Sequence, residues 1–327
     1  MIISKSNRFI QHLGFVALLG LLLSVFSQCT PDTLHLVPKI ISTGNNLPLE
    51  DVLYLNDSLA YAVGGKGYTQ GIIISSKDGG NTWKIDTIFE HALWAITKNN
   101  KGYINAVGFS GKLFLKEPNK PWDFYRLPIY FELTGTLFDK NGGAFLSSGQ
   151  SFKNGKIIHL RADYSVDTVL EMENEIQDIK YADENNLVAV GFGAVFNSTD
   201  NGHTWTRNGL EGDYFLKCIF PEPGIGYLIG FSGTLYKTND AGKNWSKLKS
   251  SGNLLYGTNT FLDICAPSTN TFYISGQRGL LLKFTNGGAD MVKIENFTED
   301  HLNAIDYRNK SLLVCSSSGK IYKFQDL

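Results

Sequence analysis

The sequence is poor in cysteine and lacks the cysteine pairs that bind metals or carry thiol redox chemistry. Its four cysteines are Cys29, Cys218, Cys265 and Cys315, and no two of them form a CxxC pair. The histidines beyond Cys29 show no i, i+2 or i, i+4 pairing either, so the sequence predicts no metal site and no cofactor. We expect the three later cysteines to be buried free thiols. The alternative in an oxidising compartment is one disulfide with a thiol left over.

Charge is also scarce, and the two signs balance. The formal net charge is −1, and no basic stripe is visible, which argues against nucleic acid as a partner. Arginine is the rarest cation: beyond Cys29 the chain holds only Arg126, Arg161, Arg207, Arg278 and Arg308. The bidentate clamps that arginine forms on carboxylates and phosphates are therefore scarce.

Long apolar runs are absent except near the N-terminus. Lys5 and Arg8 precede an apolar run from Leu13 to Phe26, which is too short to span a bilayer comfortably. This pattern is typical of an export signal, here residues 1–28. Phe26-Ser-Gln-Cys29 resembles the lipobox of Bacteroidetes-type lipoproteins, which implies that Cys29 carries lipid and that residues 29–32 tether the chain to the outer membrane or cell surface. The alternative is ordinary cleavage after Ser27, which leaves a secreted soluble protein.

Three short segments of the chain are versions of one another. They are Ser76-Lys-Asp78-Gly-Gly80-Asn-Thr82-Trp83, Ser198-Thr-Asp200-Asn-Gly202-His-Thr204-Trp205 and Thr238-Asn-Asp240-Ala-Gly242-Lys-Asn244-Trp245. The shared pattern is the Asp-box, also called a BNR-like repeat. Trp205 and Trp245 are separated by one repeat, and so are Trp83 and Trp122, which marks a degenerate copy. The repeat length of about 40 residues predicts four-stranded propeller blades.

Each box carries residues that stabilise a turn. The Asp side chain can accept hydrogen bonds from the amides of its own turn, the Gly can supply a positive φ, and the Trp can pin the hairpin to the blade. Strand-like segments flank every box, so we place it between the third and fourth strands of a blade. The boxes therefore predict structure and by themselves no chemistry.

A second set of repeats gives the number of blades. Turns of the type Val-Gly-Phe recur at Phe109, Phe192 and Phe231, and an inner strand precedes each such turn. The predicted inner strands are 49–54, 91–96, 131–137, 175–181, 215–220, 261–266 and 302–307. The sequence therefore predicts an all-β fold, a seven-bladed propeller over residues 33–327.

The last blade needs a strand from elsewhere. The chain ends shortly after Lys320-Ile-Tyr-Lys-Phe324 and has no room for a fourth strand. Residues 33–42 are strand-like and precede the first blade, so we expect them to supply the outer strand and close the ring, which removes a free edge. Pro38 fits an outermost strand, which can lose a ladder donor on its free side.

Asp-boxes also occur in sialidases, so a sialidase-like glycoside hydrolase is the alternative function. Those enzymes need an arginine triad, an Arg-Ile-Pro type motif, a Tyr nucleophile supported by Glu, and an Asp acid/base. None of the five arginines is followed by Ile-Pro. The sequence favours a non-enzymatic protein.

The blade formula, Val-Gly-x-x-Gly, an apolar strand and then Ser-x-Asp-x-Gly-x-Thr-Trp, resembles that of the photosystem II stability and assembly factor family. The resemblance covers nearly the whole chain beyond the export signal, and it implies a seven-bladed propeller that binds partner proteins during assembly. The arginine-rich patch of that family's photosynthetic members has no counterpart here. We therefore expect a cell-envelope propeller that binds an envelope protein or a glycan.

The candidate binding face is the one that carries the turns between second and third strands and the crossings between blades. Three phenylalanines occupy one repeated position there, and neighbouring segments add further rings and a cation. The candidates are Phe109, Phe192, Phe231, Tyr130, Tyr256 and Arg278, with Tyr214 in a crossing. A face rich in aromatic rings and poor in charge suits contacts with a protein or stacking on a sugar. The alternative is that these phenylalanines only pack neighbouring turns.

Overall fold

The computed structural model describes residues 33–249, 260–295 and 297–327, which belong to one compact unit, Thr33–Leu327. The predicted signal peptide, the predicted lipidation site Cys29 and the candidate Tyr256 lie outside these residues. No helix in the described part is long and apolar enough to cross a membrane.

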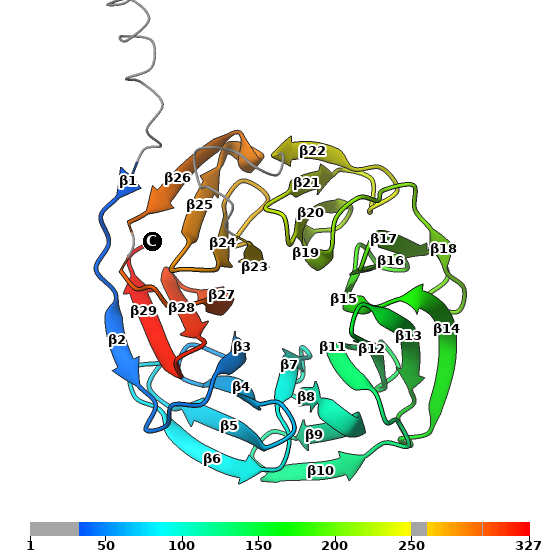
Figure 1. The fold of residues 1–327 in the computed structure, drawn as a ribbon, viewed down its shortest axis with the longest axis horizontal. Coiled ribbons are helices and arrows are strands. Elements are labelled where there is room, and N and C mark those ends of the chain that lie inside the picture. Colours follow the sequence, from blue (N-terminus) through cyan, green and yellow to red (C-terminus); the bar gives the residue numbers. More distant parts are fainter. Residues whose placement is uncertain (1–32, 250–259, 296) are drawn as a thin grey trace, which may run out of the picture. The chain divides into compact units, whose positions relative to one another are not determined.

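Seven sheets are arranged in a ring with their first strands at the centre (Figure 1), which confirms the predicted seven-bladed propeller. Blade 1 holds β3 (Leu49–Tyr54), β4 (Ala60–Lys66), β5 (Gln70–Ser76) and β6 (Lys84–Phe89). Blade 2 holds β7 (Leu93–Lys98), β8 (Ile104–Gly108), η1 (Phe109–Gly111), β9 (Lys112–Lys116) and β10 (Trp122–Arg126). Blade 3 holds β11 (Glu132–Phe138), β12 (Ala144–Gln150), β13 (Lys153–Leu160) and β14 (Val166–Asn174). Blade 4 holds β15 (Ile176–Tyr181), β16 (Leu187–Gly191), β17 (Ala194–Ser198) and β18 (Thr206–Arg207).

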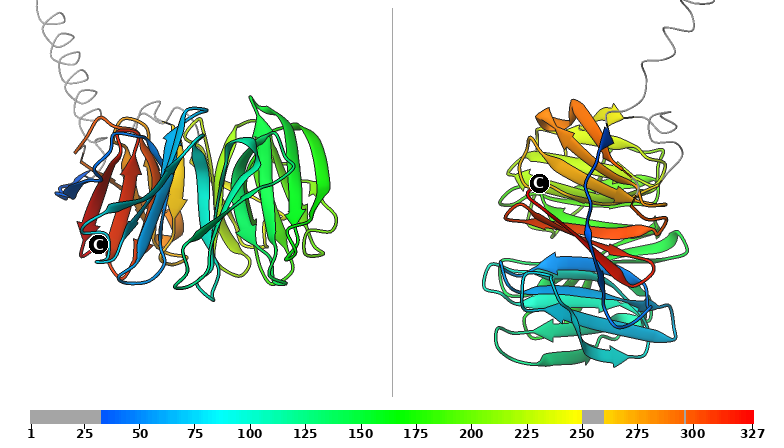
Figure 2. Two further views of the ribbon diagram at one scale, coloured as in Figure 1. Left: turned by 90° about the horizontal axis from the view of Figure 1, so that it is seen from below. Right: turned by 90° about the vertical axis from the view of Figure 1, so that its left-hand side faces the viewer.

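The remaining blades complete the ring. Blade 5 holds β19 (Phe215–Glu222), β20 (Ile225–Gly230), β21 (Leu235–Thr238) and β22 (Ser246–Lys249). Blade 6 holds β23 (Phe261–Cys265), β24 (Phe272–Gly276), β25 (Leu281–Thr285), η2 (Asn286–Gly288) and β26 (Asp290–Ile294). Blade 7 holds β27 (Leu302–Arg308), β28 (Ser311–Ser316) and β29 (Lys320–Gln325). The strands run between two faces of the ring (Figure 2): one carries the turns between second and third strands, and the other carries the remaining hairpin turns.

The hydrophobic core lies between the blades. Each of seven clusters of buried side chains joins two neighbouring sheets; Tyr61 and Ile73 of blade 1, for example, cluster with Leu93 and Phe114 of blade 2. Second strands such as β16 are buried at every residue, because both faces of the sheet are covered. This explains their continuous apolar runs.

The ring closes through a segment from the N-terminus, but the segment is divided. β2 (Lys39–Ser42) pairs antiparallel with β29 as the outer strand of blade 7, as the sequence predicts. β1 (Thr33–Leu34) instead pairs parallel with β26 of blade 6. The prediction of one outer strand over 33–42 was therefore wrong in extent, and Pro38 lies between the two strands, where it costs no ladder hydrogen bond.

The three predicted box turns connect third and fourth strands, and their hydrogen bonds repeat. Asp78 Oδ1 accepts from the amides of Asn81 and Thr82 at 2.9 Å, and its Oδ2 accepts from Thr82 Oγ1 at 2.6 Å. Asp200 and Asp240 make equivalent bonds to residues 204 and 244. Gly80, Gly202 and Gly242 have φ of 85°, 83° and 82°. Trp83 Nε1 and Trp205 Nε1 each donate to the box glycine carbonyl at 3.1 Å, while Trp245 packs against blades 4 and 5.

Candidate binding site

The structure divides the three repeated phenylalanines into two groups. Phe192 and Phe231 are 39% and 46% exposed on the face of the β16–β17 and β20–β21 turns. Phe109 is only 5% exposed, because its ring lies against Tyr68 and Trp94, with centroids 4.4 and 5.2 Å away. The prediction of Phe109 as a surface contact was wrong, and the packing alternative holds for this one position.

Phe192 and Phe231 belong to a cluster of four rings from blades 3, 4 and 5, which we call the aromatic cluster: Phe152, Phe192, Tyr214 and Phe231. Ring centroids lie 5.1 Å apart for Phe152–Phe192, 5.4 Å for Phe192–Tyr214 and 6.3 Å for Tyr214–Phe231. The rings line a pocket of about 530 Å³ together with Gly193, Gly212, Asp213 and Ser232. The pocket is apolar and open to solvent, although exposed phenylalanine is costly in water.

The backbone beneath the aromatic cluster is fixed by hydrogen bonds. The buried carboxylate of Asp213 accepts from Tyr214 N at 2.7 Å, Ser232 N at 3.2 Å and Thr234 Oγ1 at 2.5 Å. Phe231 N donates to Tyr214 O at 2.8 Å, and Phe192 N donates to Glu175 O at 2.9 Å. The backbone that carries the rings is thus held in place before any partner arrives, which lowers the entropy cost of binding.

The mouth of the central channel lies beside this cluster and is acidic. Glu50, Glu132, Glu175, Trp94, Thr134, Gln177 and Lys217 line a pocket of about 270 Å³ there. Glu175 Oε2 accepts from Phe152 N at 2.7 Å, and Gln177 Nε2 donates to Glu175 Oε1 at 2.8 Å and to Tyr214 Oη at 2.6 Å. These bonds connect the channel mouth directly to the aromatic cluster.

Burial shapes the charge of the channel mouth. Burial, followed by the charge of Asp51, raises the pKa of Glu50 to about 7. Burial also raises the pKa of Glu175, and burial with the charge of Glu175 raises the pKa of Glu132. A cationic group that entered the mouth would favour ionisation of all three carboxyls, so the mouth is complementary to a cation.

Deeper in the channel, inner strands are joined by carboxylates. Every inner strand has a register shift within its first four residues. The residue just after the shift is Asp in blades 1, 4 and 6. Asp51, Asp178 and Asp263 accept from the amide of Ile96, Cys218 and Ile305 in the next blade at 2.9, 3.1 and 2.9 Å. Blade 5 has Lys217 at this position, facing these aspartates in the channel.

The other sequence candidates lie apart from the aromatic cluster. Tyr130 is 84% exposed in the crossing from blade 2 to blade 3, and Arg278 is exposed in the β24–β25 turn of blade 6 with φ of 53°. Neither lines the aromatic pocket. The sequence missed Phe152, whose turn carries no Val-Gly-Phe motif; the signal was an exposed aromatic in the matching turn of the adjacent blade.

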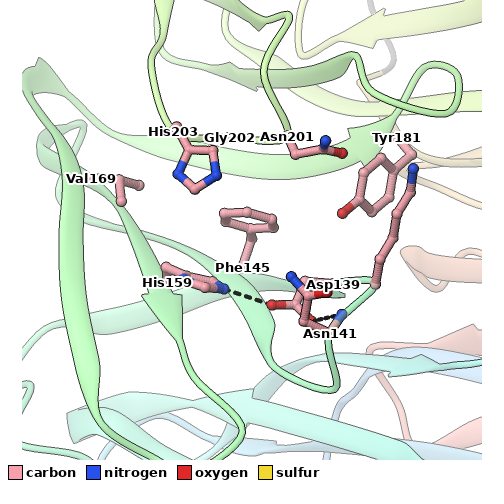
Figure 3. A pocket seen from close by; sticks show the side chains of 10 residues that line it. Asp139, Asn141, Phe145, His159, Val169, Tyr181, Asn201, Gly202 and His203 are labelled. Carbon is pink, nitrogen blue, oxygen red and sulfur yellow. Dashed lines mark hydrogen bonds and ion pairs between the residues drawn. The ribbon is translucent and has the colours of Figure 1, made fainter.

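A smaller pocket of about 180 Å³ lies on the opposite face, between blades 3 and 4 (Figure 3). His159 points toward Asp139 there, with Nε2 2.6 Å from Oδ2, and its ring stacks on Phe145 at 4.9 Å. No Ser, Thr or Cys is among the described residues that line this pocket. The Asp–His pair therefore has no hydroxyl or thiol nucleophile beside it.

Residues that an enzyme or a metal site would need are dispersed. The five arginines lie in five blades, and three of them already pair with a carboxylate: Arg161 with Asp167, Arg207 with Glu211, and Arg308 with Asp57. Within the described ranges no group of three or more His, Cys, Asp or Glu side chains is placed to hold a metal ion. Cys218, Cys265 and Cys315 are buried free thiols, and burial raises the pKa of each.

No protein-family model matches the sequence, and no curated protein matches it. Solved structures do share its fold. YCF48 bound to D1 peptide aligns with a TM-score of 0.70 at 14% identity, covering 91% of this chain and 100% of the other. The WD40 propeller domain of Doa1 gives 0.68 at 11% identity, covering 89% and 97%. Virginiamycin B lyase from Staphylococcus aureus gives 0.71 at 10% identity, covering 90% and 100%.

These likenesses concern the fold, because all three identities are low. YCF48 is a photosystem II assembly factor, so the resemblance of the blade formula to that family is supported at the level of the propeller. The neighbours include binding propellers and also an enzyme. The fold alone therefore assigns no function to this chain.

Proposed function

We propose that this chain is a non-enzymatic propeller that binds a protein partner through the aromatic cluster. An extended segment of the partner places an apolar or aromatic side chain in the pocket of Phe152, Phe192, Tyr214 and Phe231. A neighbouring Lys or Arg of the same segment reaches the acidic channel mouth.

The observation that carries this proposal is a pocket that is apolar, exposed and rigid at once. Three of its rings are phenylalanines more than a third exposed, yet their turns are tied down by the carboxylates of Asp213 and Glu175. A ring that only packed against its own turn would be more stable if it were buried, as Phe109 is. Interfaces use such fixed aromatic anchors as binding hot spots. YCF48, a propeller of the same fold, has been solved with a bound peptide.

The proposal predicts that Phe192→Ala and Phe231→Ala weaken peptide binding. Peptides would be selected from a displayed library on the folded wild-type domain, and affinities measured by fluorescence anisotropy. We expect each substitution to cost about 2 kcal/mol of binding free energy, roughly thirtyfold in affinity, with little change in stability. Selected peptides should combine an aromatic or aliphatic residue with a nearby Lys or Arg.

Two kinds of control variant separate binding from folding. Phe109→Ala removes a buried ring and should lower the free energy of unfolding by about 3 kcal/mol while the folded fraction binds normally. Asp78→Ala, Asp200→Ala and Asp240→Ala, on the opposite face, should each cost about 1–2 kcal/mol of stability and leave binding unchanged. The proposal fails if the box variants lose binding at full stability. If glycans and not peptides bind at the aromatic cluster, the partner is a glycan and not a protein. Hydrolysis of sialosides by the purified protein would favour the enzyme alternative.

We also propose that the protein works in the cell envelope, anchored to the membrane by lipid on Cys29. The support is the sequence up to Cys29, with its basic start, short apolar run and lipobox-like end. Cys29→Ser should move the protein from the membrane fraction to the soluble fraction, because acyl chains would supply the membrane affinity. Labelled fatty acid that never enters the wild-type protein would contradict this; the protein would then be secreted and soluble.

A further inference from the structure

The face opposite the aromatic cluster holds a large groove between blades 1 and 2 whose charge is strongly one-sided. It has a volume of about 990 Å³ and is built from the β3–β4, β7–β8 and β9–β10 turns, with Arg308 at the end of β27 and Lys77 near the start of the first box. Its lining holds one carboxylate, Glu117, and six cations, which together we call the basic groove: Lys77, Lys98, Lys101, Lys116, Lys120 and Arg308. Such segregation is notable in a chain whose net charge is only −1.

Four of these six cations form no ion pair within the described residues. In the part of the chain that the structure describes, Lys120 pairs with Glu117 at 2.7 Å and Arg308 pairs with Asp57. No ion pair involves the other four lysines there, although Lys98 and Lys116 donate to the carbonyls of Tyr54 and Lys120. An arriving anion would therefore gain attraction without first breaking an existing pair.

One of the three turns that line this groove, the β9–β10 turn, is the eroded box of blade 2. Leu115-Lys-Glu-Pro-Asn-Lys-Pro-Trp122 aligns with the box pattern and keeps its Trp, while Glu117 replaces the Asp and Pro121 replaces the Thr. Pro118 cannot adopt the positive φ that Gly79, Asn201 and Ala241 show at the same position in intact boxes. The β9–β10 turn, which brings Lys116 and Lys120 into the groove, thus lacks the residues that stabilise the intact box turns.

The uncharged lining also offers donors. Asn56 Oδ1 accepts from Ser58 N and Leu59 N at 3.0 and 2.8 Å, and Asn99 Oδ1 accepts from Lys101 N and Tyr103 N at 2.9 and 3.0 Å. Both amides therefore use their carbonyl within their own turn and keep the NH2 group as a donor. Burial lowers the pKa of Lys116, and the charges of Lys77 and Lys84 lower it further against the opposing effect of Asp86. An anion close to Lys116 would relieve this repulsion.

We propose that the basic groove binds an acidic oligosaccharide, a carbohydrate that carries several carboxylate or phosphate groups. The lysines meet its anionic groups, and the amides of Asn56 and Asn99 donate to its hydroxyls. Single-stranded nucleic acid fits less well, because it uses exposed rings for base stacking, and Tyr61, the one aromatic residue in the described lining, is buried. The site is separate from the aromatic cluster, so it does not depend on the proposed protein partner.

The test measures binding of defined probes to the folded protein by calorimetry. The probes are an oligogalacturonate, a phosphorylated mannan oligosaccharide, neutral maltoheptaose and a single-stranded oligonucleotide. We expect at least one acidic oligosaccharide to bind, more weakly as salt rises, and the preferred probe distinguishes carboxylate from phosphate. Lys116→Gln/Lys120→Gln should weaken that binding roughly tenfold or more.

The matched control is Lys243→Gln/Lys247→Gln, which removes the same charge from blade 5, where Lys243 lies in an intact box on the same face. It should bind like wild type, and melting curves should show that both double variants are folded. The proposal is overturned if both double variants lose the same affinity, or if neither acidic oligosaccharide binds at about 1 mM. It is also overturned if maltoheptaose binds equally well or if the oligonucleotide binds more tightly.

Discussion

A chain that begins at residue 43 is expected to unfold about 4 kcal/mol more easily than one that begins at residue 33. The deletion removes β2, which pairs with β29 along four residues, and it removes Ile41, which packs in the core cluster between blades 7 and 1. Losing one buried isoleucine costs about 2–3 kcal/mol, and the lost hydrogen bonds add to this. Urea denaturation followed by tryptophan fluorescence would measure the difference.

The matched control for this truncation is a chain that begins at residue 36. It lacks β1, which pairs through only two residues, but it keeps β2 and Leu36, so it should lose about 1 kcal/mol or less. Only the longer deletion leaves the edge of β29 open to pair with a second molecule. If the chains that begin at residues 36 and 43 both melt like the chain that begins at residue 33, β2 contributes no measurable stability to the closed ring.

The sequence predicted the fold well because each blade repeats its own local signals. The box turns, the Val-Gly-x-x-Gly turns and the inner strands each occur several times, so an eroded copy such as that of blade 2 could be placed by spacing. The division of residues 33–42 could not be predicted in this way. β1 is only two residues long and pairs parallel with β26, and a strand so short has no periodic pattern.

Repeats predicted the face of the site but not which of its residues are exposed. Phe109 and Phe231 both stand in the sequence Gly-Phe-Ser-Gly, yet the first is buried and the second is exposed. The difference arises from neighbours, since Tyr68 and Trp94 cover Phe109. The channel charges and the basic groove were missed for a related reason. Lys77, Lys116 and Arg308 are far apart in sequence and meet only when the ring closes.

A large effect of a single substitution is expected at Lys217, whose ammonium faces Asp51, Asp178 and Asp263 in the channel. Burial works to lower the pKa of Lys217, but the charges of Asp178, Asp51 and Asp263 together raise it. Lys217→Met would leave Asp51 and Asp263 without the lysine that they share, whereas Asp178 keeps its ion pair with Lys180 at 2.5 Å. Removing one partner from such a buried group costs about 3–5 kcal/mol, so we expect a loss of about 3 kcal/mol in unfolding free energy near pH 8.

The pH dependence of this loss follows from the sign of the pKa shifts. Burial raises the pKa of Asp263 to about 7 even with Lys217 present, so the stability from its protonated form is full below its usual pKa and is lost as pH rises through 7. Without Lys217 the pKa values of Asp51 and Asp263 rise further, and the variant should therefore lose much less stability near pH 5 than near pH 8. Chemical denaturation at the two pH values measures this.

Two further variants show whether charge or packing causes the loss. Lys217→Arg keeps the cation and should retain most of the stability at both pH values. Lys217→Met/Asp263→Asn removes one of the unpaired carboxylates while Asn can still accept from Ile305 N, so it should recover about half of the loss near pH 8. A Lys217→Met variant that loses the same stability at both pH values, with no recovery in the double variant, would mean that the lysine stem fills the channel and that its charge contributes little.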